Sequence, residues 1–218
     1  MRTDRELQED ILKALEFEPS VDAAKIGVSV KNGVATLQGS ARSYFEKSTA
    51  ERVTRHVYGI RAIANDVAVT LAGLTPRTDS QVAEAVANAL AWDSAVPRNA
   101  VKATVTNAWV TLNGTVDWQY QRSAALRAVD HLLGVKGVTN SITLKPHVSQ
   151  SDIKAKIESA FKRSAEVDSS HVKVEARDGS VILTGTVKSL SERDQAELAA
   201  WSAPGVVLVD DRITVSPY

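Results

Sequence analysis

The chain has 218 residues, of which 44% are hydrophobic and 24% charged, as expected of a folded globular protein and not of a disordered or fibrous one. Lys and Arg number 26, as do Asp and Glu, so the formal net charge is zero and no segment has the basic excess of a nucleic-acid-binding patch. The absence of Cys excludes disulfides, thiol catalysis and Cys-ligated metal sites.

Three copies of one unit of roughly 70 residues make up the chain. Gly39, Gly114 and Gly185 are separated by 75 and 71 residues, and the same offsets align apolar positions along the whole unit without a gap. Self-similarity at a nearly fixed period indicates a repeat architecture. We therefore predict three domains, at residues 3–71, 78–145 and 149–216.

Each copy is predicted to begin with an amphipathic helix. In the first copy Leu7, Ile11 and Leu15 recur every four positions, which marks one face of a helix. A capping box, in which a hydroxyl covers a free amide and a polar side chain reaches back, precedes this face in each copy. The three boxes are Thr3 with Glu6, Thr78 with Gln81, and Ser149 with Asp152.

A β-hairpin follows the helix. Residues 26–30 alternate apolar and polar side chains and lead into a turn at Asn32-Gly33. The third copy keeps this turn as Asp178-Gly179, whereas the second has Asn107-Ala108. Because alanine fits a positive φ poorly, we expect a different turn type in the second copy.

A second helix and a closing strand complete each copy. The predicted caps of the helix are Ser43 with Glu46, Asp117, and Ser189 with Glu192. We expect the helix to end at a shared glycine, residue 59, 134 or 205, as a left-handed C-cap. The closing strand should run parallel to the second strand of the hairpin, reached by a right-handed crossover. The predicted fold class is α+β: three tandem αββαβ modules, each with two helices packed on one face of a small mixed three-stranded sheet.

The sequence resembles the BON domain, named for bacterial osmotically induced and nodulation proteins. The resemblance rests on Asn32-Gly33, Leu37 to Gly39, Ser43 to Glu46-Lys47, Ala50, Gly59 and Asn65. The second copy departs from the pattern at Ala108 and Gln121, and the third at Asp211. The resemblance implies a non-enzymatic bacterial protein linked to osmotic or envelope stress, with relatives that contact anionic phospholipids.

No residue pattern typical of catalysis is present. The chain has no HExxH, phosphate-binding loop, dinucleotide fingerprint or GxSxG motif. We therefore predict no enzyme activity, catalytic residue, metal site or cofactor. His56 and His131 occupy equivalent positions near the end of the second helix, where the helix dipole favours a partly exposed histidine. The acidic pairs Glu9-Asp10 and Asp210-Asp211 are expected to lie on solvated faces.

Aromatic and cationic side chains gather at the start of the second helix in two copies. They are Tyr44, Phe45 and Lys47 in the first copy and Trp118, Tyr120 and Arg122 in the second, where the third has Ser189-Leu190-Ser191. Such side chains can insert at a lipid interface or dock on a partner. They can instead form a hydrophobic staple or a contact between modules. Trp92, Trp109 and Trp201 are expected to be buried between modules.

These observations predict a stress-associated adaptor or scaffold that contacts an anionic phospholipid surface or a protein partner. The alternative is a cytosolic sensor of K⁺ or Ca²⁺, because the resemblance includes a cytosolic relative that senses potassium. Met1 leads directly into a helix-start signal, and no apolar run approaches the ~20 residues of a membrane span. We therefore expect a cytoplasmic protein whose contact with the inner membrane is peripheral.

Overall fold

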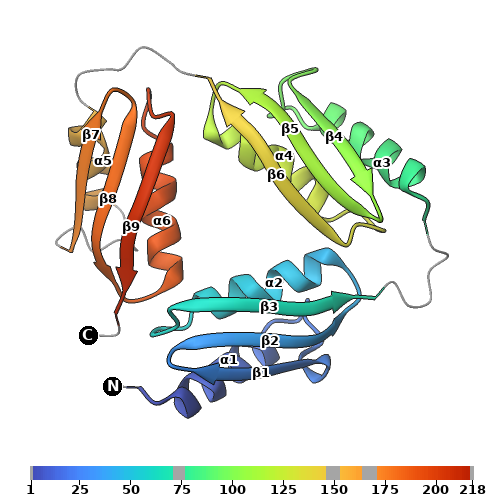
Figure 1. Ribbon diagram of the computed structural model, residues 1–218, viewed down its shortest axis with the longest axis horizontal. Coiled ribbons are helices and arrows are strands. Elements are labelled where there is room, and N and C mark those ends of the chain that lie inside the picture. The colour runs from blue at the N-terminus through green and yellow to red at the C-terminus, as the bar shows by residue number, and fades with distance from the viewer. Residues whose placement is uncertain (1, 71–76, 146–152, 164–170, 217–218) are drawn as a thin grey trace. The chain divides into compact units, whose positions relative to one another are not determined.

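The computed structural model describes residues 2–70, 77–145, 153–163 and 171–216 (Figure 1). The first module contains α1 (Asp4–Phe17), a short 3-10 turn η1 (Ala23–Lys25), β1 (Ile26–Lys31), β2 (Val34–Ala41), α2 (Tyr44–Arg55) and β3 (Ala62–Val69). The second contains α3 (Asp79–Trp92), β4 (Val101–Thr106), β5 (Trp109–Val116), α4 (Gln119–Asp130) and β6 (Gly137–Leu144). The third contains α5 (Ile153–Arg163), β7 (Val172–Arg177), β8 (Ser180–Val187), α6 (Leu190–Trp201) and β9 (Leu208–Val215).

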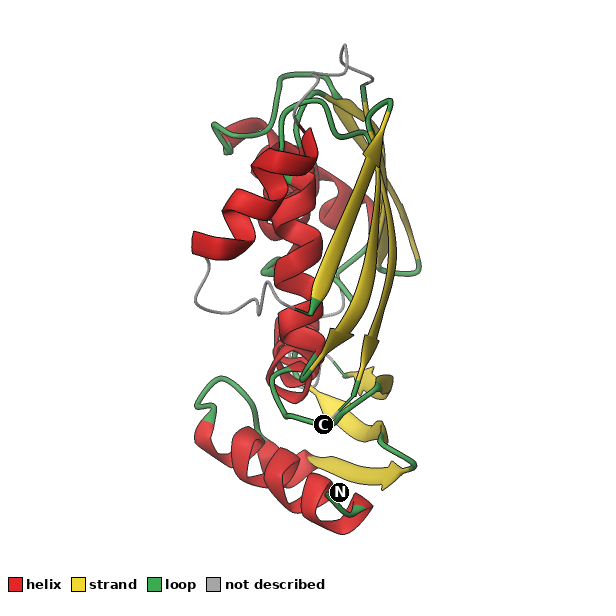
Figure 2. Ribbon diagram, turned by 90° about the vertical axis from the view of Figure 1, so that its left-hand side faces the viewer, coloured by secondary structure: helices red, strands yellow, loops and turns green. Residues whose placement is uncertain are grey.

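The strands of each module form one sheet, in which the second strand of the hairpin is central. In the second module β4 pairs with β5 antiparallel and β5 with β6 parallel, and β7, β8 and β9 repeat this arrangement. Figure 2 shows the helices of a module on one side of its strands, so each sheet has one covered face and one open face. The predicted α+β fold with three tandem αββαβ units is confirmed.

The first helices begin at the predicted caps and bury the predicted face. The amide of Glu6 donates to the Thr3 hydroxyl at 3.2 Å, and that of Gln81 to Thr78 at 3.3 Å. The box formed by Ser149 and Asp152 lies outside the described residues. The buried faces comprise Leu7, Ile11 and Leu15 in α1, Val82, Val86 and Leu90 in α3, and Ile153, Ile157 and Phe161 in α5. Each such side chain contributes about 1.5–3 kcal/mol through burial.

The hairpin turn is the same in all three modules, so the prediction of a different turn in the second was wrong. Asn107 and Ala108 have φ angles of 52° and 64°, close to the values of 53° and 74° at Asn32 and Gly33. Ala108 can take this conformation because Asp79 accepts the amides of both turn residues at 2.8 Å. This two-residue turn matches the twist of the strands that it connects.

One glycine of each module is required by a close approach of two backbone segments. Gly39, Gly114 and Gly185 have φ angles of 121°, 148° and 135°. A Cβ atom at these positions would collide with the carbonyl oxygen of Lys25, Ala100 or His171. Steric exclusion therefore explains why glycine stands at this place in every copy.

The second helices end before the shared glycines, so the prediction of a glycine C-cap was wrong. Their last residues are Arg55, Asp130 and Trp201. The caps of α4 and α6 are His131 and Ser202, both in the right-handed region. The shared glycines have positive φ angles of 93°, 99° and 94° in the turns that lead into the closing strands.

The chain divides into two compact units. Unit 1 comprises Met1–Gly39, Thr49–Val67 and Pro146–Tyr218, and unit 2 comprises Ser40–Ser48 and Ala68–Lys145. The boundary passes through α2. The start of α2 therefore belongs to unit 2 and its end to unit 1.

Candidate binding surface

A buried carboxylate organises the start of the second helix in the first and third modules. Glu46 is 3% exposed, and its Oε2 accepts the amide of Arg42 at 2.6 Å. Its own amide donates to the Ser43 hydroxyl at 3.1 Å. The pair Ser189–Glu192 has the same geometry at 3.1 Å. Both predicted capping pairs are confirmed, and they fix the chain between strand and helix.

In the second module the N-cap is Trp118, so the prediction of Asp117 was wrong. Gln121 replaces the glutamate, and its Oε1 accepts the amides of both Asp117 and Trp118 at 3.0 Å. The carboxylate of Asp117 lies 3.1 Å from Nζ of Lys145 instead. A neutral amide therefore caps α4, and the indole of Trp118 lies just outside its first turn.

The side chains at the start of α4 are open to solvent. Trp118 is 38% exposed and Tyr120 is 59% exposed. Arg122, one turn further along, is half-buried. Two aromatic rings and a guanidinium group thus come from five consecutive positions of one segment, 118–122.

The aromatic residues at the start of α2 are less exposed, because they pack within unit 2. The rings of Phe45 and His131 have centroids 4.3 Å apart, and Tyr44 packs against the core of the second module. Next to them, Oγ of Ser48 lies 3.2 Å from Oδ1 of Asp130. Burial raises the pKa of the Asp130 carboxyl, and the Ser48 hydroxyl and His131 oppose this effect. The first pair of predicted aromatics therefore makes a contact between modules.

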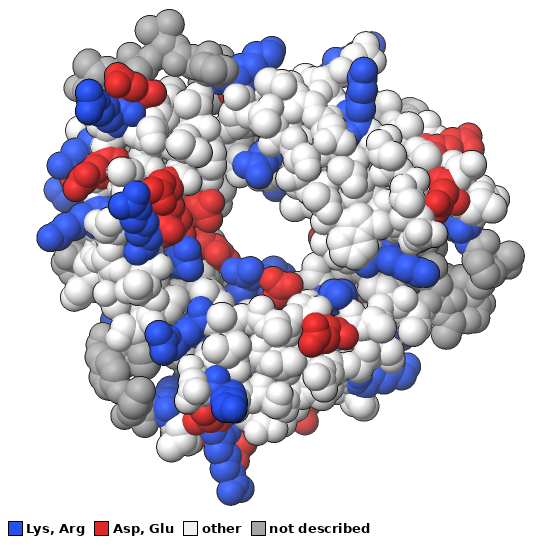
Figure 3. Space-filling view, in the orientation of Figure 1, with Lys and Arg blue, Asp and Glu red and all other residues white. Residues whose placement is uncertain are grey.

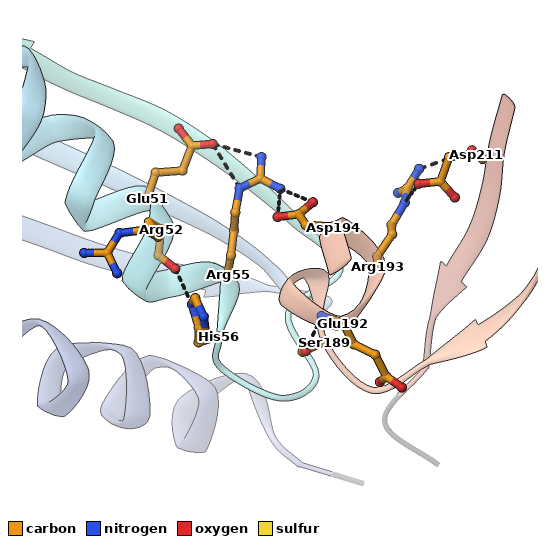
Figure 4. Close-up of polar contacts among 9 residues, drawn as sticks. All are labelled: Glu51, Arg52, Arg55, His56, Ser189, Glu192, Arg193, Asp194 and Asp211. Atoms are coloured by element: carbon orange, nitrogen blue, oxygen red, sulfur yellow. Dashed lines mark hydrogen bonds and ion pairs between the residues drawn. The ribbon is translucent and has the colours of Figure 1, made fainter. Parts of the chain in front are cut away.

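A related contact occurs within unit 1. Arg55 bonds to Glu51 on its own helix at 3.0 Å and to Asp194 on α6 at 3.3 Å (Figure 4). Asp194 and Arg55 occupy the repeat positions of Ser48 and Asp130. Burial raises the pKa of Asp194, and the charge of Arg55 opposes the rise. The same two positions of the repeat thus meet in both units, with different chemistry.

The third module has different side chains at the start of its second helix, α6. Leu190 is buried, and Arg193 occupies the position of Lys47 and Arg122. Nε of Arg193 donates to Asp211 at 2.6 Å (Figure 4). Asp211 is 10% exposed, so the prediction that it lies on a solvated face was wrong. The other copies have a neutral Asn, Asn65 or Asn140, in place of Asp211, so this ion pair has no equivalent at that position there.

Two of the tryptophans expected to be buried are exposed. Trp92 is 88% exposed at the end of α3, and Phe17, at the same place in the first module, is 90% exposed. Trp109 is 48% exposed on the open face of its sheet. Trp201 is half-buried and donates its indole N–H to Glu197 at 3.1 Å. The exposure of Phe17 and Trp92 could have been predicted from the sequence, because each is the last residue of its helix and lies off the apolar face of that helix.

Charged groups of both signs are scattered over the surface seen in Figure 3, with wide uncharged areas between them. The described residues contain no group of three or more His, Asp or Glu side chains that could hold a metal ion. Among the same residues, no helix is long and apolar enough to cross a membrane.

The fold therefore defines a tandem array of small αββαβ modules. The family model of the BON domain matches residues 3–70, 78–146 and 149–217. Because these matches cover most of the sequence, the chain belongs to the BON domain family, and the resemblance seen in the sequence is confirmed.

The individual proteins that this chain is similar to include one curated relative and two solved structures, described below. The chain is 32% identical over 105 residues to the osmotically-inducible protein Y of Escherichia coli (strain K12), a match covering 44% of this chain and 52% of the relative. It thus spans about half the length of this curated relative.

The structures are of CdsD, a structural protein of the type III secretion system of Chlamydia trachomatis. One is 13% identical with a TM-score of 0.29, covering 96% of this chain and 92% of that one. The other, the C-terminal domain, is 14% identical with a TM-score of 0.26, covering 99% and 100%.

Proposed function

We propose that this BON-family chain is a non-enzymatic, stress-associated binding protein that contacts anionic phospholipid surfaces through the start of α4. The observation that carries the proposal is the exposure of Trp118 and Tyr120 beside Arg122. The name of the relative, an osmotically-inducible protein, supports a link to osmotic stress.

The chemistry of these three side chains suits a lipid headgroup region. Trp and Tyr combine an apolar ring with a polar atom, so they are stable where hydrocarbon meets water. A guanidinium group binds phosphate oxygens through several N–H donors. Each cation near an anionic membrane contributes about 1 kcal/mol, and salt screens this contribution.

The other predicted residues have a smaller part in this proposal. Tyr44 and Phe45 already pack within unit 2, so their rings are less available to a lipid. Lys47 supplies a further cation on α2. The zero net charge of the chain gives little long-range attraction, so binding depends on local contacts.

Co-sedimentation with vesicles tests the proposal. Vesicles of phosphatidylcholine alone are compared with vesicles that also contain phosphatidylglycerol, at low and at physiological salt. We expect the protein to pellet only with the anionic vesicles, and less at the higher salt. The double variant Trp118→Ser, Tyr120→Ser should lose most of this binding.

The double variant should fold, because serine occupies both equivalent positions in the third module, at Ser189 and Ser191. Leu208→Ser, which removes another exposed apolar side chain, should pellet as the unmodified protein does. Equal pelleting with neutral and anionic vesicles would contradict the choice of an anionic lipid, and pelleting that the double variant retains would contradict the assignment to the start of α4. No pelleting with either kind of vesicle would contradict the membrane proposal and favour a protein partner.

A further inference from the structure

The open face of the sheet in the second module is almost uncharged. The register places Thr104, Thr111 and Thr139 in one row across β4, β5 and β6. The next row contains Lys102, Asn113 and Ser141. Apart from Lys102, these side chains end in hydroxyl or amide groups that both donate and accept hydrogen bonds.

A tryptophan ring is fixed at one end of this face. The indole N–H of Trp109 donates to Oγ1 of Thr139 on β6 at 2.8 Å. The ring covers Gly137, the cross-strand neighbour of Trp109, so closely that a Cβ atom there would collide with it. Because the ring is held by the hydrogen bond and by the glycine, its exposed side forms a flat apolar platform beside the polar rows.

The corresponding faces of the other modules lack this combination. In the third module Ser180 stands in place of Trp109, and Glu175, Asp210 and Arg212 stand in place of Thr104, Thr139 and Ser141. Figure 3 shows this contrast as a largely white surface over β4–β6 and charged groups of both signs over β7–β9. In the first module Val34 and Ala62 replace Trp109 and Gly137.

Threonine on a solvated strand face needs no function, because its β-branched side chain favours strands. A half-exposed tryptophan held flat by a glycine and a hydrogen bond is not explained in this way. Protein interfaces have an apolar centre of several large side chains, which the polar rows do not supply. Phosphate-rich partners require several cations, and the rows contain one, Lys102.

A neutral sugar matches these features. A pyranose ring has a face of C–H groups, which stacks on an aromatic ring, and a rim of hydroxyl groups, which exchange hydrogen bonds with hydroxyl and amide side chains. We propose that the open face of β4–β6 binds a neutral polysaccharide. One sugar ring stacks on Trp109, and the adjoining sugar rings lie along the rows that contain Thr104 and Asn113. This proposal is independent of the lipid surface proposed at the start of α4.

The test measures binding of the full chain to neutral glycans. Pull-down on insoluble cellulose, chitin and starch is followed by calorimetric titration with cellotetraose, chitotetraose and maltotetraose. We expect retention on at least one polymer and saturable binding of the matching tetrasaccharide. Trp109→Ser should weaken this binding at least tenfold, whereas Trp92→Ala, at an exposed tryptophan elsewhere, should leave it unchanged.

A second variant keeps Trp109 and changes the rows, including Thr139, where an aspartate oxygen replaces the hydroxyl as acceptor for the indole N–H. Thr139→Asp with Ser141→Arg introduces the pair formed by Asp210 and Arg212 in the third module, whose nitrogen and oxygen atoms lie 2.6 Å apart, so the fold accommodates it. It should also weaken glycan binding at least tenfold, with an unchanged melting temperature. Failure of the protein to bind any of the three glycans, or equal binding by Trp109→Ser, would overturn the proposal. A dimer that Trp109→Ser dissociates would assign the face to self-association instead.

Discussion

The carboxylate of Asp79 accepts the backbone amide of Ala108 at 2.8 Å and thereby supports a φ angle of 64° at a residue other than glycine. Asp4 supports Gly33 in the same way at 3.0 Å. In both modules the first turn of the first helix is thus tied to the hairpin turn, although the two segments lie far apart in the sequence. A charge-assisted hydrogen bond can hold this turn where glycine is absent.

Replacement of Ala108 by glycine should stabilise the second module. The left-handed conformation costs alanine about 1–2 kcal/mol. Glycine makes the unfolded chain more flexible, which lowers the stability by roughly 0.4–1 kcal/mol, so the relief of strain is the larger effect. We expect the free energy of unfolding to rise by up to about 1 kcal/mol in chemical denaturation. Gly33→Ala, the reverse change in the first module, should lower it, and a stabilising effect there would contradict this explanation.

Removal of the carboxylate should be more costly at Asp79 than at Asp4. Asp79→Ala leaves two turn amides without their acceptor and Ala108 without support, so we expect a loss of about 1–3 kcal/mol. Asp4→Ala removes the equivalent bonds of the first module, to the amides of Asn32 and Gly33. Because Gly33 adopts its φ angle without strain, the loss of stability should be smaller. Denaturation of the two variants side by side measures the difference. Equal losses would mean that the carboxylate does not support Ala108 specifically.

The elements that the sequence predicted correctly depend on local spacing. The recurrence of Leu7, Ile11 and Leu15 specifies a buried helix face, and the repeat offsets identify the same face in each copy. The turn at Ala108 was mispredicted because its support comes from Asp79, 29 residues earlier. Local conformational preference therefore gave the wrong answer where a distant side chain supplies the hydrogen bonds.

The candidate surface was predictable only as a set of residue types. Aromatic residues beside cations mark the starts of α2 and α4 equally in the sequence, yet Tyr120 is exposed and Phe45 packs against His131. Which ring is covered depends on contacts between modules, and repeat alignment contains no information about them. The pairing of Arg193 with Asp211 was likewise hidden, because helix and strand positions meet only in the folded module.

Replacement of Asp130 by asparagine should stabilise unit 2 near neutral pH. Burial raises the pKa of this carboxyl in the folded state, so the stability contributed by the neutral form is lost as the pH rises through that pKa. Asparagine cannot ionise and keeps an acceptor for the Ser48 hydroxyl. The variant should therefore melt at a higher temperature at neutral pH, and its advantage should shrink as the carboxyl of the unmodified protein becomes protonated.

Asp194→Asn provides the contrasting control in unit 1. Burial raises the pKa of Asp194 too, but its carboxylate faces Arg55 at 3.3 Å, and asparagine would remove that ion pair. We expect the melting temperature of this variant to fall or stay constant at neutral pH. A gain for Asp130→Asn that does not depend on pH would count against burial of the charge as its cause.

The third module should depend on Asp211 far more than on its neighbour Asp210. Both carboxylates lie 2.6 Å from an arginine, but the pair of Arg193 and Asp211 is 34% and 10% exposed, whereas that of Arg212 and Asp210 is 61% and 40% exposed. Asp211 also accepts the amide of Ile213 at 2.9 Å.

Asp211→Asn should therefore lower the free energy of unfolding by about 1–3 kcal/mol. Asp210→Asn should change it by less than about 1 kcal/mol, because water screens the exposed pair. Since asparagine already occupies the position of Asp211 in the other two modules, the fold itself accepts the substitution. Denaturation in low and high salt checks the assignment: equal losses for the two variants, or a loss at Asp211 that salt abolishes, would show that burial does not set the strength of the pair with Arg193.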